Sequence, residues 1–143
     1  MSNKITIIGA GQVGSTVAYA LTLKQLASEI VIIDILKDKA MGEAMDIRQG
    51  TPFIGPVYIH DGDYEDAKDS DIVIFTSGVG RKPGQSRLDL TQTNVNIAKS
   101  VIPLITKVAP NALYLIVANP VDILTYLFVK TSGIPANHIF GTG

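Results

Sequence analysis

Six short runs of apolar, mostly β-branched residues recur along the chain, with helical periodicity between them. They cover residues 5–8, 30–34, 57–60, 71–76, 113–118 and 138–140. Several runs are apolar at consecutive positions, which is typical of strands buried on both faces of a parallel sheet. Because strands alternate with helices, the pattern predicts an α/β domain with right-handed crossovers.

The segments between these runs predict the helices. Helical patterns cover residues 13–28, 37–49, 86–108 and 122–132, with a short helical turn at 63–68. Pro103 is expected to kink or break the longest helix, because proline lacks a backbone donor. Residues 77–85 carry three glycines, one proline and two cations before that helix. This composition indicates a mobile binding loop.

Composition and charge narrow the classes of function. The chain has 143 residues, 46% of them hydrophobic, with a net charge of −1 and no cysteine. Near-neutral charge predicts no nucleic-acid partner and no membrane partner. The missing cysteine excludes disulfides, thiolate nucleophiles and cysteine-ligated metals. The sequence contains no signal-peptide pattern and no apolar run long enough to span a membrane, so we expect a cytoplasmic protein. We also expect no metal site.

A glycine-rich motif follows the first predicted strand and opens the first helix. Residues 9–14 read Gly-Ala-Gly-Gln-Val-Gly, which has the form G-x-G-x-x-G. In this context Gly9 permits a tight turn, Gly11 lets the backbone approach a pyrophosphate, and Gly14 lets the helix pack against the strand. The helix N-terminus adds free amides and a partial positive charge. The motif therefore predicts a site for dinucleotide phosphates.

An acidic residue ends the second predicted strand, 20 positions after the last glycine of the motif. The carboxylate of this residue, Asp34, can accept hydrogen bonds from the adenosine ribose and would repel a 2′-phosphate, which favours NAD over NADP. The alternative is a structural glycine turn followed by an exposed aspartate. That alternative requires strand, glycines, helix and acid to fall in register by chance.

Further candidates lie where the later strands end. Arg81 and Arg87 lie on the segment between the fourth strand and the longest helix, where the nicotinamide end of a dinucleotide is expected. Guanidinium groups there can bind a carboxylate or polarise a carbonyl. An ordinary solvated loop is the alternative. Asn119, after the fifth strand, could contact a ligand or simply cap a helix. His60 and His138 lack a paired carboxylate, so we interpret both as structural.

Together these motifs make the sequence resemble the L-lactate/malate dehydrogenase family along essentially its whole length. The resemblance rests on IIGAGQVGST at 7–16, the acid in VIIDI at 31–35, GEAMD at 42–46, SGVGRKPGQSRLDL at 77–90, ANPVDILTY at 118–126 and IFGTG at 139–143. It implies a doubly wound Rossmann domain spanning residues 1–143, with six parallel strands in the order 3-2-1-4-5-6. The family's catalytic domain would be absent from this chain.

The resemblance also implies a role for individual residues. Arg87 matches the arginine that closes over the substrate and polarises its carbonyl, and Asn119 matches the asparagine near the nicotinamide and the substrate oxygen. The implied NAD contacts are Gly9, Gly11, Gln12, Val13, Gly14, Asp34, Thr76, Gly78 and Asn119. The family's catalytic histidine and its aspartate partner would lie beyond residue 143. We therefore expect the chain alone to bind NAD without turning over substrate.

Different features of the sequence favour different substrates. Arg81 lies at the family position that selects among 2-oxo acids, where arginine suits malate dehydrogenases and glutamine suits lactate dehydrogenases. The flanking segments look more like bacterial lactate dehydrogenases, while Gln85 fits neither pattern. The sequence thus predicts the NAD domain of an L-2-hydroxy acid dehydrogenase, with lactate and pyruvate favoured over malate and oxaloacetate.

Two further expectations concern the class and the assembly of the protein. A non-catalytic dinucleotide-binding module is the alternative from another class, although a pure sensor would not need the cations of the 77–85 loop. An enzyme using NADP is a third possibility, against which Asp34 argues. The partner is expected to be a small 2-oxo or 2-hydroxy acid, and the parent enzyme is expected to be a homo-oligomer.

Overall fold

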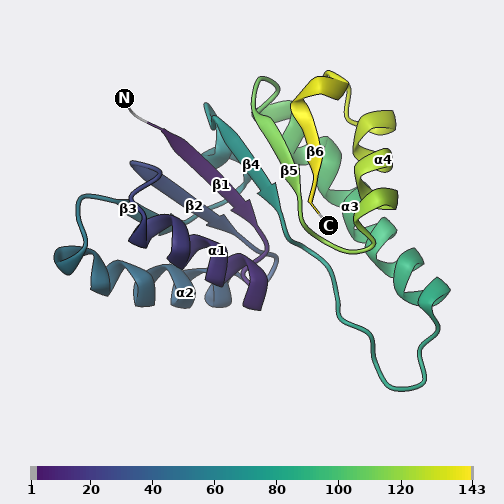
Figure 1. The fold of residues 1–143 in the computed structure, drawn as a ribbon, viewed down its shortest axis with the longest axis horizontal. Coiled ribbons are helices and arrows are strands. Elements are labelled where there is room, and N and C mark those ends of the chain that lie inside the picture. Colours follow the sequence, from purple (N-terminus) through teal and green to yellow (C-terminus); the bar gives the residue numbers. More distant parts are fainter. Residues whose placement is uncertain (1–2, 143) are drawn as a thin grey trace.

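A six-stranded parallel sheet forms the centre of the computed structural model, which describes residues 3–142 (Figure 1). The strands lie in the order β3-β2-β1-β4-β5-β6, which confirms the predicted Rossmann topology. Their bounds are β1 Lys4–Ile8, β2 Glu29–Ile33, β3 Tyr58–Asp61, β4 Ile72–Phe75, β5 Leu113–Ile116 and β6 Ile139–Gly141. The strand order reverses between β1 and β4, and ligands of such sheets bind beside that point.

Helices cover both faces of the sheet. The α-helices are α1 Gln12–Leu23, α2 Lys37–Gly50, α3 Arg87–Val108 and α4 Val121–Thr131, and short 3-10 turns are η1 Thr51–Phe53, η2 Tyr64–Ala67 and η3 Ala136–His138. Within β2, Ile30 and Ile32 pack in one core cluster with α1 and α2, while Val31 and Ile33 pack in the other with α3 and α4. Burial on both sides explains why the strand runs are apolar at consecutive positions.

One predicted helix boundary was wrong, and the break considered at Pro103 is absent. Helix α1 ends at Leu23 instead of continuing to residue 28, because Gln25 takes a left-handed conformation (φ 51°) and the amide of Leu26 turns back to the carbonyl of Leu21. Helix α3 runs through Pro103 without a break. That proline lies on the exposed side of the helix, where water can bond to the carbonyl that lacks a donor.

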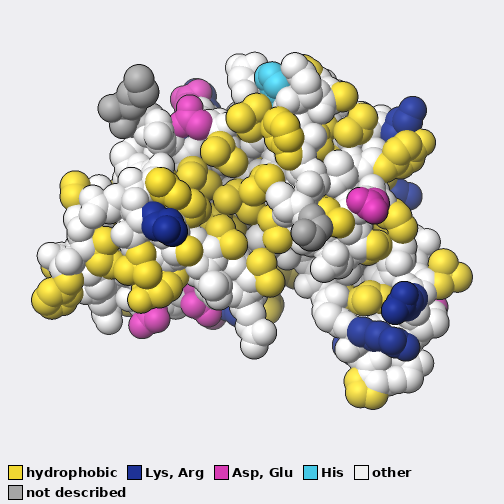
Figure 2. Space-filling model, viewed as in Figure 1, with side chains coloured by type: hydrophobic (Ala, Val, Ile, Leu, Met, Phe, Trp, Pro, Cys, Tyr) yellow, Lys and Arg dark blue, Asp and Glu magenta, His cyan; other side chains and the backbone are white. Residues whose placement is uncertain are grey.

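The face that carries α1 and α2 is only partly covered. These two helices pack over β1, β2 and β3, whereas the same face of β4, β5 and β6 lacks a helix within residues 3–142 (Figure 1). Leu113 and Phe140 are 40% and 47% exposed there. Figure 2 shows hydrophobic side chains gathered over the middle of this view. No helix within the described residues is long and apolar enough to cross a membrane.

Candidate dinucleotide site

The three glycines of the motif differ in the space around them. Gly9 has a φ of +111°, and a Cβ on it would lie 2.6 Å from the hydroxyl oxygen of Thr76. A Cβ on Gly14 would lie 1.8 Å from the carbonyl oxygen of Gly9. Gly11, by contrast, faces open space, with no atom within 4 Å of an added Cβ. The fold itself therefore requires Gly9 and Gly14, whereas the space at Gly11 is available to a ligand.

Asp34 lies directly after β2 and is bonded to the glycine loop. Its Oδ2 accepts a hydrogen bond from the amide of Ala10 at 2.7 Å, and its Oδ1 accepts one from the amide of Leu36 at 2.9 Å. Each carboxylate oxygen has a second lone pair and can accept another hydrogen bond. Asp34 can thus fix the loop and still receive two ribose hydroxyls.

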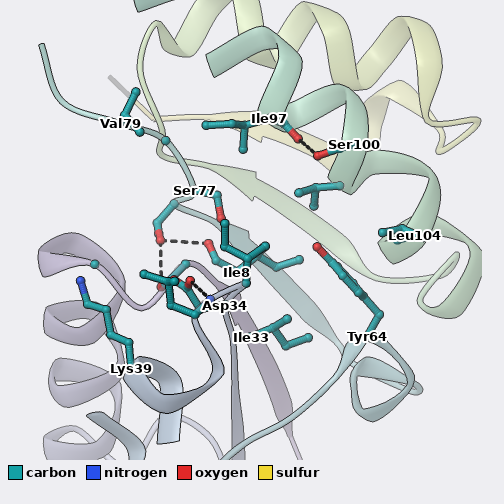
Figure 3. A pocket seen from close by; sticks show the side chains of 17 residues that line it. Ile8, Ile33, Asp34, Lys39, Tyr64, Ser77, Val79, Ile97, Ser100 and Leu104 are labelled. Atoms are coloured by element: carbon teal, nitrogen blue, oxygen red, sulfur yellow. Dashed lines mark hydrogen bonds between the residues drawn. The ribbon is translucent and has the colours of Figure 1, made fainter. Parts of the chain in front are cut away.

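A cavity of about 440 Å³, here called the apolar cavity, opens between the glycine loop and helix α3 (Figure 3). Asp34 and the side chains after β2 form one side, and residues of α3 form the other. Its apolar lining side chains are Ile8, Ile33, Ile35, Leu36, Val79, Ile97, Val101 and Leu104. An apolar slot with a carboxylate at one end suits a flat base attached to a hydroxylated sugar.

Tyr64 and Lys39 are among the polar side chains of this cavity that the sequence analysis missed. Tyr64 lies in η2 and lines the wall opposite Lys39, which comes from α2 (Figure 3). Burial, and to a smaller extent the negative charge of Asp34, raise the pKa of the Tyr64 phenol. The phenol is therefore neutral at physiological pH and keeps a proton to donate. Neither residue belongs to the glycine motif, so only the tertiary structure could find them.

A second cavity of about 360 Å³, here called the loop cavity, lies on the other side of the segment that leaves β4. It is bounded by the 77–85 loop, by α3 and by the exit of β5. Its lining residues are Val13, Thr76, Gly78, Val79, Gly80, Arg81, Leu90, Asn94, Val117, Ala118 and Asn119. Because Thr76, Gly78 and Val79 line both cavities, the two spaces meet along one segment.

Most of the predicted site residues are brought together by these two cavities. Gly9, Gly11 and Asp34 line the apolar cavity, and Thr76 and Gly78 line both. Val13, Arg81 and Asn119 line the loop cavity. Gln12, Gly14 and Arg87 line neither cavity.

The residues outside the cavities have other surroundings. Gln12 is exposed in the first turn of α1, and Gly14 is buried against Gly9. Arg87 is exposed as the first residue of α3. Its guanidinium does not line the loop cavity in this conformation, so closure of Arg87 over a substrate stays a prediction.

The loop that joins β4 to α3 extends away from the sheet, and Lys and Arg side chains gather at its end (Figures 1 and 2). Its tip is a hydrogen-bonded turn: the amide of Gln85 donates to the carbonyl of Lys82, and Gly84 takes a φ of +79°. The Gln85 side chain accepts from the amide of Lys82, and Nε of Arg81 donates to the carbonyl of Gln85. Mobility of this loop stays a prediction.

A buried asparagine, also missed from the sequence, holds the base of this loop. Asn94 is 2% exposed and bonds to the backbone of both Val79 and Asn119. A signal was present: Asn94 is a polar residue within the apolar stripe that runs from Leu90 to Ile97 on the longest helix. A polar side chain inside such a stripe is buried, and a buried amide needs partners.

The histidines have surroundings that fit a structural role. For His60 the expected lack of a carboxylate partner was wrong: its Nε2 lies 2.9 Å from a carboxylate oxygen of Glu29 on the neighbouring strand β2, and its ring stacks on Tyr58. His138 lies in η3, immediately before β6. Neither of them lines either cavity. Among residues 3–142, no three His, Cys, Asp or Glu side chains come together as metal ligands.

The fold and the site define a dinucleotide-binding Rossmann domain. Residues 3–141 match the family described as lactate/malate dehydrogenase, NAD binding domain. The chain is 58% identical to an L-lactate dehydrogenase of Clostridium perfringens over 142 residues, which cover 99% of this chain and 45% of that protein. The chain belongs to the NAD-binding domain family of lactate/malate dehydrogenases, which confirms the predicted family and cofactor.

Solved structures agree with this assignment. A ligand-bound minor L-lactate dehydrogenase of Enterococcus mundtii has a TM-score of 0.95 and 41% identity, over 99% of this chain and 46% of that one. A malate dehydrogenase of Archaeoglobus fulgidus in complex with NADH has a TM-score of 0.92 and 42% identity, over 98% of this chain and 48% of that one. The chain thus spans slightly less than half the length of these relatives.

Proposed function

We propose that this domain binds NAD(H) in an extended form across both cavities. The adenosine occupies the apolar cavity with its ribose on Asp34, the pyrophosphate crosses Gly11, and the nicotinamide enters the loop cavity. The observation that carries the proposal is the junction of the two cavities beside an open Gly11. The N-terminus of α1, which begins at the next residue, directs its free amides at that point.

We further propose that the bound nicotinamide exchanges a hydride with a small 2-oxo or 2-hydroxy acid. In the reducing direction, the hydride of NADH adds to the carbonyl carbon and the carbonyl oxygen takes up a proton. Arg81 places positive charge at the loop cavity, where it can attract an anionic substrate, and Asn119 places a polar side chain at the exit of β5. The ring itself would rest against Val13 and Val117, which line the same cavity.

The residues of the two cavities position and polarise but do not supply the proton. The lining of the loop cavity contains no Asp, Glu, His, Cys or Lys, and its only charged side chain is Arg81. Arginine stays protonated throughout and is a poor general acid. The acid must therefore come from a part of the enzyme outside this cavity.

Pyruvate and lactate are the substrates we propose, since the relative that is 58% identical carries the name L-lactate dehydrogenase. Malate and oxaloacetate form the second candidate, because Arg81 lines the loop cavity and could pair with a second carboxylate. We also propose that the enzyme containing this domain is a cytoplasmic homo-oligomer. The exposed apolar face of β4 to β6 offers surface for packing within such an assembly.

Calorimetric titration of the chain with NADH and with ADP-ribose tests the binding proposal. Saturable binding of both ligands, with NADH the tighter, is expected if both cavities are used. Failure to bind either ligand would refute it. Oxidation of NADH by the enzyme that contains this domain, with pyruvate and with oxaloacetate as substrates, tests the second proposal. Arg81→Gln should raise the preference for pyruvate, whereas Lys82→Gln, one residue further on the loop, should leave that preference unchanged.

A further inference from the structure

We propose that Asn94 is a positioning residue that builds the nicotinamide half of the site by joining the exit of β4 to the exit of β5. The proposal rests on the NAD binding proposed above. It adds that one buried amide on α3 sets the shape of the loop cavity, while the apolar cavity keeps its shape without it.

The hydrogen bonds of Asn94 use both ends of its amide. Oδ1 accepts from the amide of Val79 at 2.9 Å. Nδ2 donates to the carbonyl of Asn119 at 2.8 Å and to the carbonyl of Val79 at 3.3 Å. An asparagine amide has two N–H donors, and both are used here. Of the neutral side chains of this size, only a carboxamide can accept one of these bonds and donate the other two.

The side chain of Asn94 is also closely packed. A Cβ on Gly78 would lie 3.3 Å from the amide carbon, nitrogen and oxygen of Asn94, so glycine at 78 leaves the space that this amide fills. Asn94 is 2% exposed, and a buried amide that loses its partners is costly. Asn94 lies seven residues after Arg87, about two turns further along α3. The side chain of Asn94 therefore fixes the start of α3 relative to the ends of β4 and β5.

The two cavities depend on these bonds to different degrees, because Val79 lines both whereas Asn94 and Asn119 line the loop cavity alone. Val79, Asn94 and Asn119 all line the loop cavity. Strand and helix side chains such as Ile8, Ile33 and Val101 line the apolar cavity, and neither Asn94 nor Asn119 does. Loss of the Asn94 bonds should therefore loosen the nicotinamide half and spare the adenosine half.

Two substitutions separate positioning from general stability. Asn94→Leu keeps the approximate volume and removes all three hydrogen bonds. Asn94→Asp keeps an acceptor for the amide of Val79 but directs a carboxylate at two carbonyl oxygens, and only its protonated form can donate to one of them. The effect of Asn94→Asp should therefore diminish at low pH. Asn96→Asp is the matched control, because Asn96 is exposed on the same helix.

The experiment titrates the chain and these variants with NADH and with ADP-ribose, by calorimetry. We expect both Asn94 variants to bind NADH about tenfold more weakly and ADP-ribose within about twofold of the unmodified chain. The Asp variant should regain NADH affinity at about pH 5 relative to about pH 8. Asn96→Asp should leave the affinity for both ligands unchanged at either pH.

The remaining outcomes are each decisive. If the unmodified chain binds neither ligand, the proposed function itself fails. If it binds NADH and ADP-ribose equally, there is no nicotinamide half to position, and the inference about Asn94 is overturned. Equal weakening of both ligands by the variants, or no weakening of NADH, would also overturn it. If the Leu variant does not fold, the pH dependence of the Asp variant decides. Unfolding of both variants at about pH 5 would make Asn94 a fold residue and overturn the proposal.

Discussion

The apolar cavity and the loop cavity are neighbours, yet they are built in different ways. Ile8, Ile33 and Val101, in the wall of the first, are also members of the core cluster on that face of the sheet. The second is walled on one side by Val79, Gly80 and Arg81, which lie outside regular structure. One half of the site is therefore an extension of the core, and the other half depends on a few hydrogen bonds.

This difference has a physical basis in how each wall is held. Core side chains are fixed by close packing with many neighbours, so a cavity among them exists before the ligand arrives. The loop is fixed by the amide of Asn94 at its base and by the Gln85 turn at its tip. The comparison predicts that the adenosine half is preformed, whereas the nicotinamide half can adjust to what it binds.

The largest effect is expected from Gly11→Val, at the junction of the two cavities. The added side chain would enter the open space beside Gly11 and block the pyrophosphate, so NADH and ADP-ribose should both bind at least about 100-fold more weakly. Circular dichroism should show an unchanged fold. Gly42→Val is the control, because Gly42 also faces open space but lies on α2 outside both cavities. Normal binding by a folded Gly11→Val variant would contradict the path we propose.

Next in size is the discrimination against NADPH, which the comparison assigns to the apolar cavity alone. Repulsion between Asp34 and a 2′-phosphate should weaken NADPH at least about tenfold relative to NADH, or about 1.4 kcal/mol. Lys39 lines the same cavity and opposes this repulsion, so Lys39→Gln should increase the discrimination. Competition titrations measure both ratios. Equal affinities in the unmodified chain would show that Asp34 does not select the cofactor.

Hydrogen exchange should show a smaller difference between the two halves. In the free chain we expect amides of the 77–85 loop to exchange faster than those of β4, because few contacts hold the loop. NADH should slow exchange in the loop, and ADP-ribose should not. Loop amides as protected as those of β4 before any ligand is added would mean that both halves are preformed.

The smallest effect is expected at Thr76, which lines both cavities. Its hydroxyl donates to the carbonyl of Ile8, with the carbonyl of Gly9 also within reach. Thr76→Val keeps the shape and removes this bond, so NADH and ADP-ribose should weaken by the same factor of about three. Thr93→Val removes a similar bond within α3, outside both cavities, and should change the affinity for neither ligand. If Thr76→Val weakened NADH and ADP-ribose by different factors, Thr76 would belong to one half of the site only.

Local patterns were sufficient to predict the fold class, whereas the strand order came from the family resemblance. Consecutive apolar residues indicated strands buried on both faces, and the spacing of Asp34 from the glycine motif placed the acid beside the loop. These features repeat over a few residues or follow a fixed motif, so they can be read along the chain. The early end of α1 could not be read in this way, since it depends on the left-handed turn at Gln25.

The candidate site was less predictable where it depends on long-range contacts. Asn94 bonds to Val79 and Asn119, which are 15 and 25 residues away in sequence. The apolar stripe could indicate that Asn94 is buried, but no local period encodes which groups it bonds to. Likewise, no local pattern shows that Arg87, the first residue of α3, lies outside the loop cavity.

The two hydrogen bonds that Asp34 accepts from the backbone have a consequence for protein engineering. Because its carboxylate also receives the amide of Ala10, a replacement chosen to admit a phosphorylated ribose would remove an acceptor from the glycine loop. Such a redesign would disturb the pyrophosphate site together with the sugar site it was meant to alter. A successful redesign of cofactor preference would have to supply Ala10 with a new acceptor first.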